Sequence, residues 1–321
     1  MPPVKIGISL GDPGGIGPEV TVKALFSSSQ LPDAKYIIFG PESVVRNEIK
    51  KAGLKHNSAS SNTSIHDLPL YSESFKTGCP SRENGEISFF CFQTAVQEAQ
   101  KGSLDAVVTA PISKESWKLA QLEWAGHTEY LSRDYPEAIM SFFSKKLNVA
   151  LFTHHISLKK AIKKIKKQAL LEFFIKLDEF SRKANQKRFH LLIPGLNPHA
   201  GEQGIMGNEE VTEIAPAVNA AKEKGIPISG PFPPDTIYKR AYKDNTKMVA
   251  ALYHDQGLIA FKIISFEEGV NVTLGLPFIR TSPDHGTAFD IAGKGTADPT
   301  SMREALKKAV QFSRNMDYEQ S

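Results

Sequence analysis

Histidines follow three separate apolar stretches of the chain that are typical of β-strands. Ligands of open α/β sheets bind beyond the carboxyl ends of the strands, so side chains at these positions are candidates for a shared site. Neutral imidazole is the commonest metal-ligating side chain, and three histidines with one open coordination position form a catalytic arrangement. The sequence therefore predicts a catalytic divalent metal held by strand-end histidines. The strands and the histidines that follow them are Val149–Phe152 with His154 and His155, Phe189–Ile193 with His199, and Val249–Tyr253 with His254.

Either His154 or His155 could be the metal ligand that follows the strand Val149–Phe152. If the strand before them continues, successive side chains point to opposite faces, and we expect only one of the two to face the site. The residues alone leave the choice between them open.

These strands alternate with segments of helical spacing along the whole chain. Such alternation predicts βαβ units, and the near-continuous apolar runs are typical of strands buried on both faces. We expect an α/β protein with two α/β/α lobes and a cleft between them. The further expected strands are Val4–Leu10, Lys35–Phe39, Ala106–Thr109 and Ile259–Ile264, and the expected helices are Gly17–Phe26, Glu42–Ala52, Phe92–Lys101, Glu209–Lys224 and Thr300–Val310.

Length and composition place the chain among ordinary globular proteins. Its 321 residues suffice for a large core, and 40% hydrophobic with 23% charged residues is a typical balance. A net charge of +4 does not indicate a nucleic-acid or membrane-surface protein. Cys79 and Cys91 lack CxxC spacing, and we expect both to be buried thiols. With no signal-peptide pattern and no long apolar stretch, we expect a cytoplasmic protein.

A glycine-rich stretch, GDPGGIGPE from Gly11 to Glu19, follows the first expected strand. It lacks the GxGxxG spacing of a dinucleotide fingerprint. We expect a shaped strand-to-helix turn near the cleft or the cofactor, and we assign it no specific ligand.

Polar residues gather in two further stretches. AGHTEYL holds His127 and Thr128, and Thr128 also fits a simple helix N-cap. The long stretch from Gly275 to Gly295 is polar and rich in glycine, and loops of such length in compact domains are usually functional or disordered. Its aromatic and apolar residues argue against disorder. Upstream, Lys262 is expected in an apolar strand, where it needs a partner or faces the cleft.

Seven motifs occur in a consistent order over nearly the whole chain. They are GDPGGIGPE, TAPISKE, GHTEYL, LNPHAGEQGIMGNEE, GPFPPDT, YHDQGL and RTSPDHGTAFDIAGKG. As an ordered set, they resemble the 4-hydroxythreonine-4-phosphate dehydrogenase family of vitamin B6 biosynthesis.

The resemblance implies a set of site residues. It implies one divalent metal (Zn, Mg or Co) held by His155, His199 and His254, which selects His155 over His154. The substrate contacts that it implies are His127, Thr128, Lys262, Asn271 and Arg280.

The segment DHGTAFDIAGKG also resembles the cofactor loop of isocitrate and isopropylmalate dehydrogenases. This likeness implies their fold and places NAD or NADP against His285, Gly286 and Asp290. The family resemblance further implies a homodimer with a shared active site, so the three histidines need not converge within one chain. We expect residues 1–125 plus 266–321 to form the cofactor-side lobe, and residues 126–265 the metal, substrate and dimerisation lobe.

The activity implied by the resemblance is a metal-dependent oxidation of 4-phosphooxy-L-threonine with NAD or NADP. The product, 2-amino-3-oxo-4-phosphooxybutanoate, would decarboxylate to 3-amino-2-oxopropyl phosphate on the way to pyridoxal 5'-phosphate. Asp235 is the candidate for proton transfer or for orienting a ligand histidine, and it also fits a turn aspartate that caps the next helix. The motifs do not separate this enzyme from paralogous dehydrogenases for 4-phospho-threonate or erythronate. A metal-dependent phosphate-ester hydrolase is a further alternative.

Overall fold

A computed structural model of the chain describes residues 3–27, 31–54, 62–68, 75–184 and 188–317. These residues form two compact α/β units: unit 1 contains residues up to Ala138 and from Leu276, and unit 2 contains Ile139–Gly275. The expected α/β class is confirmed. The likeness to isocitrate and isopropylmalate dehydrogenases stays a prediction. Among the described residues, none of the helices combines the length and the apolar character that a bilayer crossing requires.

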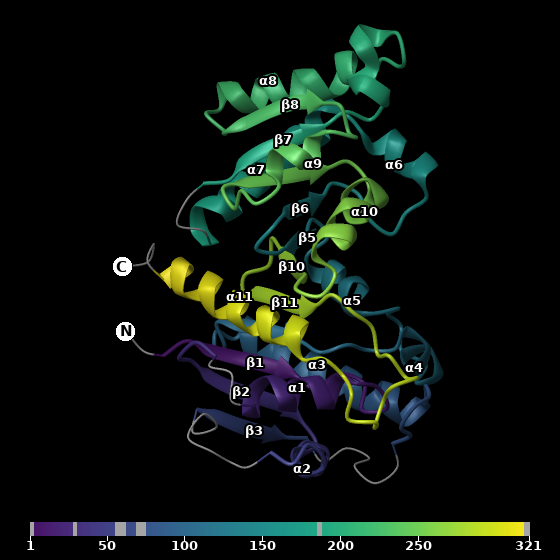
Figure 1. Ribbon diagram of the computed structural model, residues 1–321, viewed down its shortest axis with the longest axis vertical. Coiled ribbons are helices and arrows are strands. Elements are labelled where there is room, and N and C mark those ends of the chain that lie inside the picture. Colours follow the sequence, from purple (N-terminus) through teal and green to yellow (C-terminus); the bar gives the residue numbers. More distant parts are fainter. Residues whose placement is uncertain (1–2, 28–30, 55–61, 69–74, 185–187, 318–321) are drawn as a thin grey trace. The chain divides into compact units, whose positions relative to one another are not determined.

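Unit 1 is built on a parallel sheet with the strand order β3-β2-β1-β4-β11 (Figure 1). Right-handed crossovers place α1 and α2 on one face of this sheet and α3 on the other. Helix α11 packs beside α1 and against β11. The elements are β1 (Lys5–Ser9), α1 (Gly17–Phe26), β2 (Lys35–Gly40), α2 (Glu42–Lys51), β3 (Thr63–Asp67), α3 (Arg82–Gln100), β4 (Ala106–Thr109), α4 (Lys114–Leu119), α5 (His127–Asp134), β11 (Ile279–Pro283) and α11 (Thr300–Asp317).

Unit 2 has a mixed sheet with the order β10-β5-β6-β9-β7-β8. The pairs of β10 with β5 and of β5 with β6 are antiparallel, and the remaining neighbours are parallel. The elements are β5 (Ile139–Phe143), β6 (Asn148–Leu151), α6 (Leu158–Lys164), α7 (Lys167–Ala184), β7 (His190–Pro194), η2 (Pro198–Gly204), η3 (Glu210–Ile214), α8 (Ala215–Glu223), β8 (Ile228–Phe232), α9 (Ile237–Ala241), β9 (Lys247–Ala251), α10 (His254–Ser265) and β10 (Val270–Leu274).

Several of the expected elements differ in the structure. Helix α3 begins at Arg82, ten residues before the expected Phe92. The stretch Ile259–Ile264, expected as a strand, lies inside helix α10. The long stretch after Gly275, expected as a loop, contains strand β11, whose five residues are all buried. The periodicity of a short apolar run does not distinguish a strand from a helix, which explains the error at α10. Strand β11 was missed because its residues Arg280–Ser282 are polar although they are buried.

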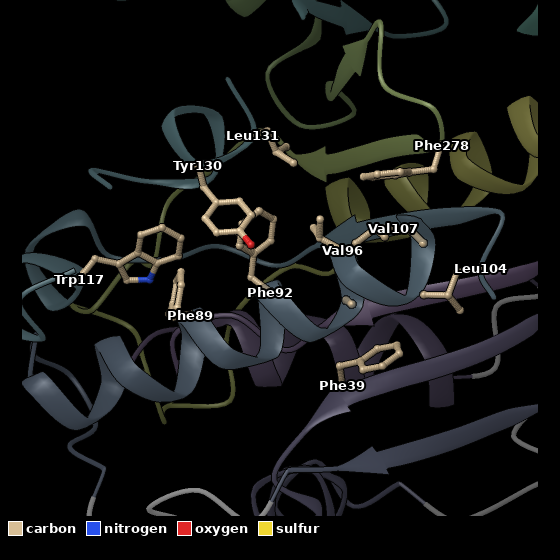
Figure 2. Close-up of a cluster of buried hydrophobic side chains, with 12 residues drawn as sticks. Phe39, Phe89, Phe92, Val96, Leu104, Val107, Trp117, Tyr130, Leu131 and Phe278 are labelled. Carbon is tan, nitrogen blue, oxygen red and sulfur yellow. The ribbon is translucent and has the colours of Figure 1, made fainter. Parts of the chain in front are cut away.

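The cores of the units are separate clusters. In unit 1, aromatic side chains of α3 pack against Trp117 of α4 and Tyr130 of α5, so that α5 joins this core (Figure 2). In unit 2, Phe142 and Phe261 lie within a second cluster, and β10 pairs with β5. Helix α5 therefore belongs to unit 1 and strand β10 to unit 2. The lobes expected from the sequence, residues 1–125 plus 266–321 and residues 126–265, stay a prediction.

The two cysteines differ in their environment. Cys91 is fully buried in α3, and burial raises the pKa of its thiol to about 12. Cys79 is a free and exposed cysteine, so the expectation of two buried thiols is wrong for this residue.

Candidate active site

A pair of basic side chains, the buried Arg280 and the half-buried His127, lies in unit 1. Arg280 is only 3% exposed in β11 and pairs with Val107 of β4, and its side chain reaches Thr109 at the carboxyl end of that strand. Its Nη2 donates a hydrogen bond to Thr109 Oγ1 at 2.7 Å and another to His127 Nδ1 at 3.2 Å. The structure therefore brings together two of the predicted substrate residues, Arg280 and His127.

The protonation state of His127 follows from this contact. A guanidinium only donates hydrogen bonds, so Nδ1 must accept and the proton of the neutral ring lies on Nε2. The pKa of His127 is well below its ordinary value because burial disfavours the imidazolium, and the nearby cations Arg280 and Lys114 lower it further. Among the described residues, no hydrogen-bond partner meets the buried Nε2. His127 thus presents a neutral N–H donor beside a cation.

Aromatic rings fix the orientation of this imidazole. Its centroid lies 4.3 Å from that of Phe92 and 5.6 Å from that of Trp117, two rings of the core cluster in Figure 2. The same low-polarity setting lowers the pKa of Arg280 to about 10 through burial. A buried guanidinium, an N–H donor and the first turn of α5 together suit an anionic group such as phosphate or carboxylate.

Thr128 occupies the second residue of α5 and is half-buried. The N-cap of this helix is Gly126, with no side-chain hydrogen bond at the cap. The simpler interpretation of Thr128 as the N-cap is therefore wrong. Thr128 lies in the first turn of α5, and its contact with a substrate stays a prediction.

A second candidate site, in unit 2, lies where β6 and β9 end. A cavity of about 240 Å³ is lined there by His154, His155, Tyr253, His254 and Asp255, among others. The ring centroids of His155 and His254 are 5.7 Å apart. His254 begins helix α10, and its Nδ1 is hydrogen bonded to Asp255 Oδ1 at 2.6 Å. Two of the three predicted metal ligands are thus neighbours.

The alternation expected for His154 and His155 does not occur. Strand β6 ends at Leu151, and His155 has a left-handed backbone with a φ of 41°. Both side chains therefore line the same cavity. A strained backbone at a non-glycine residue often marks a functional site.

His199 lies elsewhere in unit 2. It begins five consecutive residues with a left-handed backbone, the turn 199–203, with φ between 43° and 75°. Within the described ranges, the structure contains no group of three or more His, Cys, Asp or Glu side chains able to hold a metal ion. Of the three histidines selected because they follow strands, His155 and His254 are therefore neighbours within the chain, and His199 lies apart from them.

The buried carboxylate of Glu210 organises the chain around this turn. Glu210 is 3% exposed, and its Oε1 accepts hydrogen bonds from the backbone N–H groups of Leu196 and Asn197, both at 2.7 Å. Its Oε2 accepts another from Asn197 Nδ2 at 2.9 Å. A Cβ on Gly201 would lie 2.5 Å from the same Oε2, so this position accepts only glycine without rearrangement.

The remaining predicted residues of unit 2 are in varied settings. Lys262 is half-buried on helix α10, with its Nζ 5.5 Å from the ring centroid of Phe266, so its expected place in a strand is wrong. Asn271 lies in β10, and its buried Oδ1 has no hydrogen-bond partner among the described residues. Asp235 is exposed in the turn before α9, whose N-cap Thr236 makes no side-chain cap bond.

The predicted cofactor residues follow β11 in unit 1. Gly286 and Asp290 are exposed, and a Cβ placed on Gly286 would meet no atom within 4 Å. His285 Nδ1 is 3.0 Å from the carbonyl oxygen of Gly286, whereas its Nε2 is buried and without a hydrogen-bond partner in the described part of the chain. An open backbone beside an unsatisfied ring nitrogen is compatible with a polar ligand.

The sequence interpretation missed Thr109, Glu210 and Asp12. Thr109 ends β4, and the rule that selected the histidines, a polar residue at a strand's end, would have found it. Asp12 follows β1, so the same rule would have found it too. Glu210 offered no such signal, because its importance comes from burial. Burial raises the pKa of Asp12 to about 6, although hydrogen bonds from Ser116 and from the backbone lower it in part.

Comparisons with known proteins confirm the family that the ordered motifs resemble. A family model described as "Pyridoxal phosphate biosynthetic protein PdxA" matches residues 32–309. The chain is 41% identical to a 4-hydroxythreonine-4-phosphate dehydrogenase of Sulfurihydrogenibium sp., covering 97% of this chain and 99% of that protein. It is 38% identical to a D-threonate 4-phosphate dehydrogenase of Salmonella typhimurium, covering 96% and 98%. The crystal structure of a 4-hydroxythreonine-4-phosphate dehydrogenase from Klebsiella pneumoniae superposes with a TM-score of 0.84 at 35% identity, covering 97% and 99%.

Proposed function

The chain belongs to the PdxA family of pyridoxal phosphate biosynthetic proteins, and from this premise we propose that it oxidises 4-phosphooxy-L-threonine with NAD or NADP and a divalent metal. The product is 2-amino-3-oxo-4-phosphooxybutanoate, a β-keto acid that decarboxylates to 3-amino-2-oxopropyl phosphate. The observation that carries this proposal is the contact between the buried Arg280 and the half-buried His127, because this pair suits an anionic substrate group.

The substrate residues divide by chemistry. In unit 1, Arg280 supplies a fixed positive charge, and His127 Nε2 with the hydroxyl of Thr128 supplies hydrogen bonds for a phosphate or carboxylate. In unit 2, Lys262 supplies a second cation and Asn271 a buried amide oxygen without a partner among the described residues. A dianionic phosphate and a carboxylate on one substrate require such separate cations.

The metal is proposed to bind at His155 and His254. Their ring centroids are 5.7 Å apart, and imidazole nitrogens are ordinary ligands of divalent metals, so these two residues would hold the ion. The bond from His254 Nδ1 to Asp255 leaves Nε2 as the coordinating atom and orients the ring. His199 lies apart from this pair, so the complete set of three histidines forms only in the proposed homodimer.

A bound divalent cation supplies Lewis-acid chemistry at the hydroxyl that is oxidised, and a bound nicotinamide takes up the hydride. Asp235 is proposed for the accompanying proton transfer or for orienting a ligand histidine. Its carboxylate is exposed, so it can exchange protons with water. The cofactor is held by His285, Gly286 and Asp290, where the open backbone and the unsatisfied His285 nitrogen leave room for hydrogen bonds.

A homodimer is supported by an apolar stripe on one side of α10. Ile259, Ile263 and Phe266 are 62%, 80% and 64% exposed and recur at helical spacing, whereas Leu258 and Phe261 of the same helix face the core. A row of large exposed apolar side chains on one helix marks an interaction surface. A second copy of this chain is the proposed partner, and the cytoplasm is its proposed location.

The second candidate is oxidation of D-threonate 4-phosphate or a related phosphorylated sugar acid. It is favoured by the 38% identity to a relative with that name, which is close to the 41% of the first relative. The two substrates share the phosphate and the carboxylate, so the basic pair of unit 1 accepts both.

Purified protein assayed side by side with both substrates, a divalent metal and NAD or NADP tests the proposal. Formation of reduced nicotinamide with 4-phosphooxy-L-threonine at a clearly higher kcat/KM supports it. Turnover of D-threonate 4-phosphate alone selects the second candidate. Release of phosphate without any nicotinamide indicates a hydrolase and rejects both oxidations.

A further inference from the structure

The glycine-rich loop Gly11–Glu19 packs against the segment 285–297 that holds the proposed cofactor residues. The backbone N–H of Ile16 donates to the carbonyl oxygen of Thr287 at 2.9 Å. A Cβ on Gly15 would lie only 2.7 Å from the same oxygen, so the glycine permits two backbones to approach closely. The loop thus holds the beginning of the segment.

Helix α1, which continues from this loop, holds the other end of the segment through Glu19 and Lys23. The ammonium of Lys23 donates to Glu19 Oε1 at 2.7 Å, to the carbonyl of Gly295 at 2.9 Å and to that of Ala297 at 3.0 Å. Glu19 Oε1 also accepts from the backbone N–H of Ala297 at 2.9 Å. All three donors of the ammonium are used, so one i,i+4 pair binds three backbone groups.

The hydrogen bonds of this ion pair are strengthened by the burial of Glu19. Glu19 is 4% exposed and Ala297 is 2% exposed. Hydrogen bonds to charged groups are stronger than neutral ones, and removing one partner leaves the other charge buried and uncompensated. Between its two attachments, the segment has turns and coil without a helix or strand, and Gly286 and Asp290 remain exposed.

We propose that Glu19 and Lys23 are positioning residues that fix the segment 285–297 in the conformation that receives the nicotinamide dinucleotide. The inference rests on the proposed function for the identity of that ligand. It also assigns a role to the motif GDPGGIGPE: the loop contacts the segment that binds the ligand rather than the ligand itself.

The variants Lys23→Met and Glu19→Gln test the proposal, with Lys23→Arg as the conservative replacement. Lys23→Met removes the donors to both carbonyls, whereas Glu19→Gln keeps an acceptor for Ala297 but removes the charge. The matched control is Glu42→Gln on α2, because the side chains of Glu42 and Arg46 form an exposed i,i+4 pair and hydrogen bond to each other. Circular dichroism verifies that each variant is folded.

Two readouts are needed. Hydrogen–deuterium exchange of peptides covering 285–297 reports the segment itself, and titration with NAD and NADP gives the dissociation constant. We expect Lys23→Met to accelerate exchange in this segment and to raise the dissociation constant at least tenfold, with smaller effects for Glu19→Gln and partial recovery in Lys23→Arg. The control is expected to match the wild type in both.

Unchanged exchange in Lys23→Met and Glu19→Gln would overturn the inference, and so would faster exchange with unchanged dinucleotide binding. Wild-type protein that binds neither NAD nor NADP contradicts the proposed function itself. Wild-type protein that binds the dinucleotide and folded variants that bind it equally well contradict only the role of the pair.

Discussion

The buried carboxylate of Asp12 predicts an unusual pH dependence of stability. Asp12 is 0% exposed, and its Oδ1 and Oδ2 accept hydrogen bonds from the Gly14 N–H at 2.8 Å and the Ser116 hydroxyl at 2.7 Å. These bonds only partly offset the cost of burying the charge, so the pKa rises from 3.8 to about 6. The perturbation is Asp12→Asn, which has similar shape and does not titrate.

The sign and size of the effect follow from linkage. Because the folded pKa lies above the unfolded one, the folded state binds more protons between pH 4 and 6, and stability falls as pH rises through this window. A shift of about two units at 1.36 kcal/mol each gives roughly 3 kcal/mol. Domains of 150–250 residues shift in Tm by about 2–4 °C per kcal/mol, so the wild type should lose roughly 6–12 °C relative to Asp12→Asn across the window.

Thermal unfolding of both proteins, followed by circular dichroism between pH 4 and 7.5, measures this difference. All other titrating groups are common to both proteins, so the difference in Tm isolates residue 12. A wild-type minus variant difference that stays constant with pH would refute the reasoning, because Asp12 would then have an ordinary pKa in the folded protein.

Three further predictions concern the site. Ile263→Asp puts a charge on the apolar stripe of α10 and is expected to convert a dimer into monomers in analytical ultracentrifugation; an unchanged mass would place the interface elsewhere. Glu210→Gln replaces an oxygen that accepts from Asn197 Nδ2 with an NH2 donor. It is expected to weaken Zn²⁺ binding about tenfold by calorimetry, because Asn197 lies just before the turn that carries His199; equal affinity would show that Glu210 does not position His199. Thr109→Val deletes one acceptor of Arg280, and a lost hydrogen bond to a charged group costs about 1.5–3 kcal/mol. It should raise KM for the phosphorylated substrate more than it lowers kcat, and an unchanged KM would contradict a role in substrate binding.

The secondary structure was predictable where burial and periodicity agree. Helix Gly17–Phe26 and strand Ala106–Thr109 have the bounds expected from the sequence. The sequence predicted a strand in place of part of helix α10. The reason is that Ile259 and Ile263 are apolar yet exposed, so the helix has two apolar sides. A short window through such a helix has the composition of a buried strand.

The site was predictable only as far as strand ends determine it. That rule selected His254 and the adjacent His154 and His155. The family resemblance then chose His155, which is the neighbour of His254 in the structure. Glu210 accepts hydrogen bonds from Leu196 and Asn197, just before the left-handed turn that begins at His199. Glu210 is eleven positions after His199 in the chain, and local spacing does not encode these bonds. Arg280 was found by motif resemblance, whereas its burial in β11 depends on pairing with β4, which lies more than 150 residues earlier in the chain.

The most direct test of the central claim compares metal-stripped protein with and without added Zn²⁺, Co²⁺ or Mg²⁺ in the oxidation of 4-phosphooxy-L-threonine. We expect formation of reduced nicotinamide to disappear on chelation and to return with a divalent ion in the wild type, but not in folded His254→Ala. Full activity in verified metal-free protein, or undiminished activity of His254→Ala, would contradict the account.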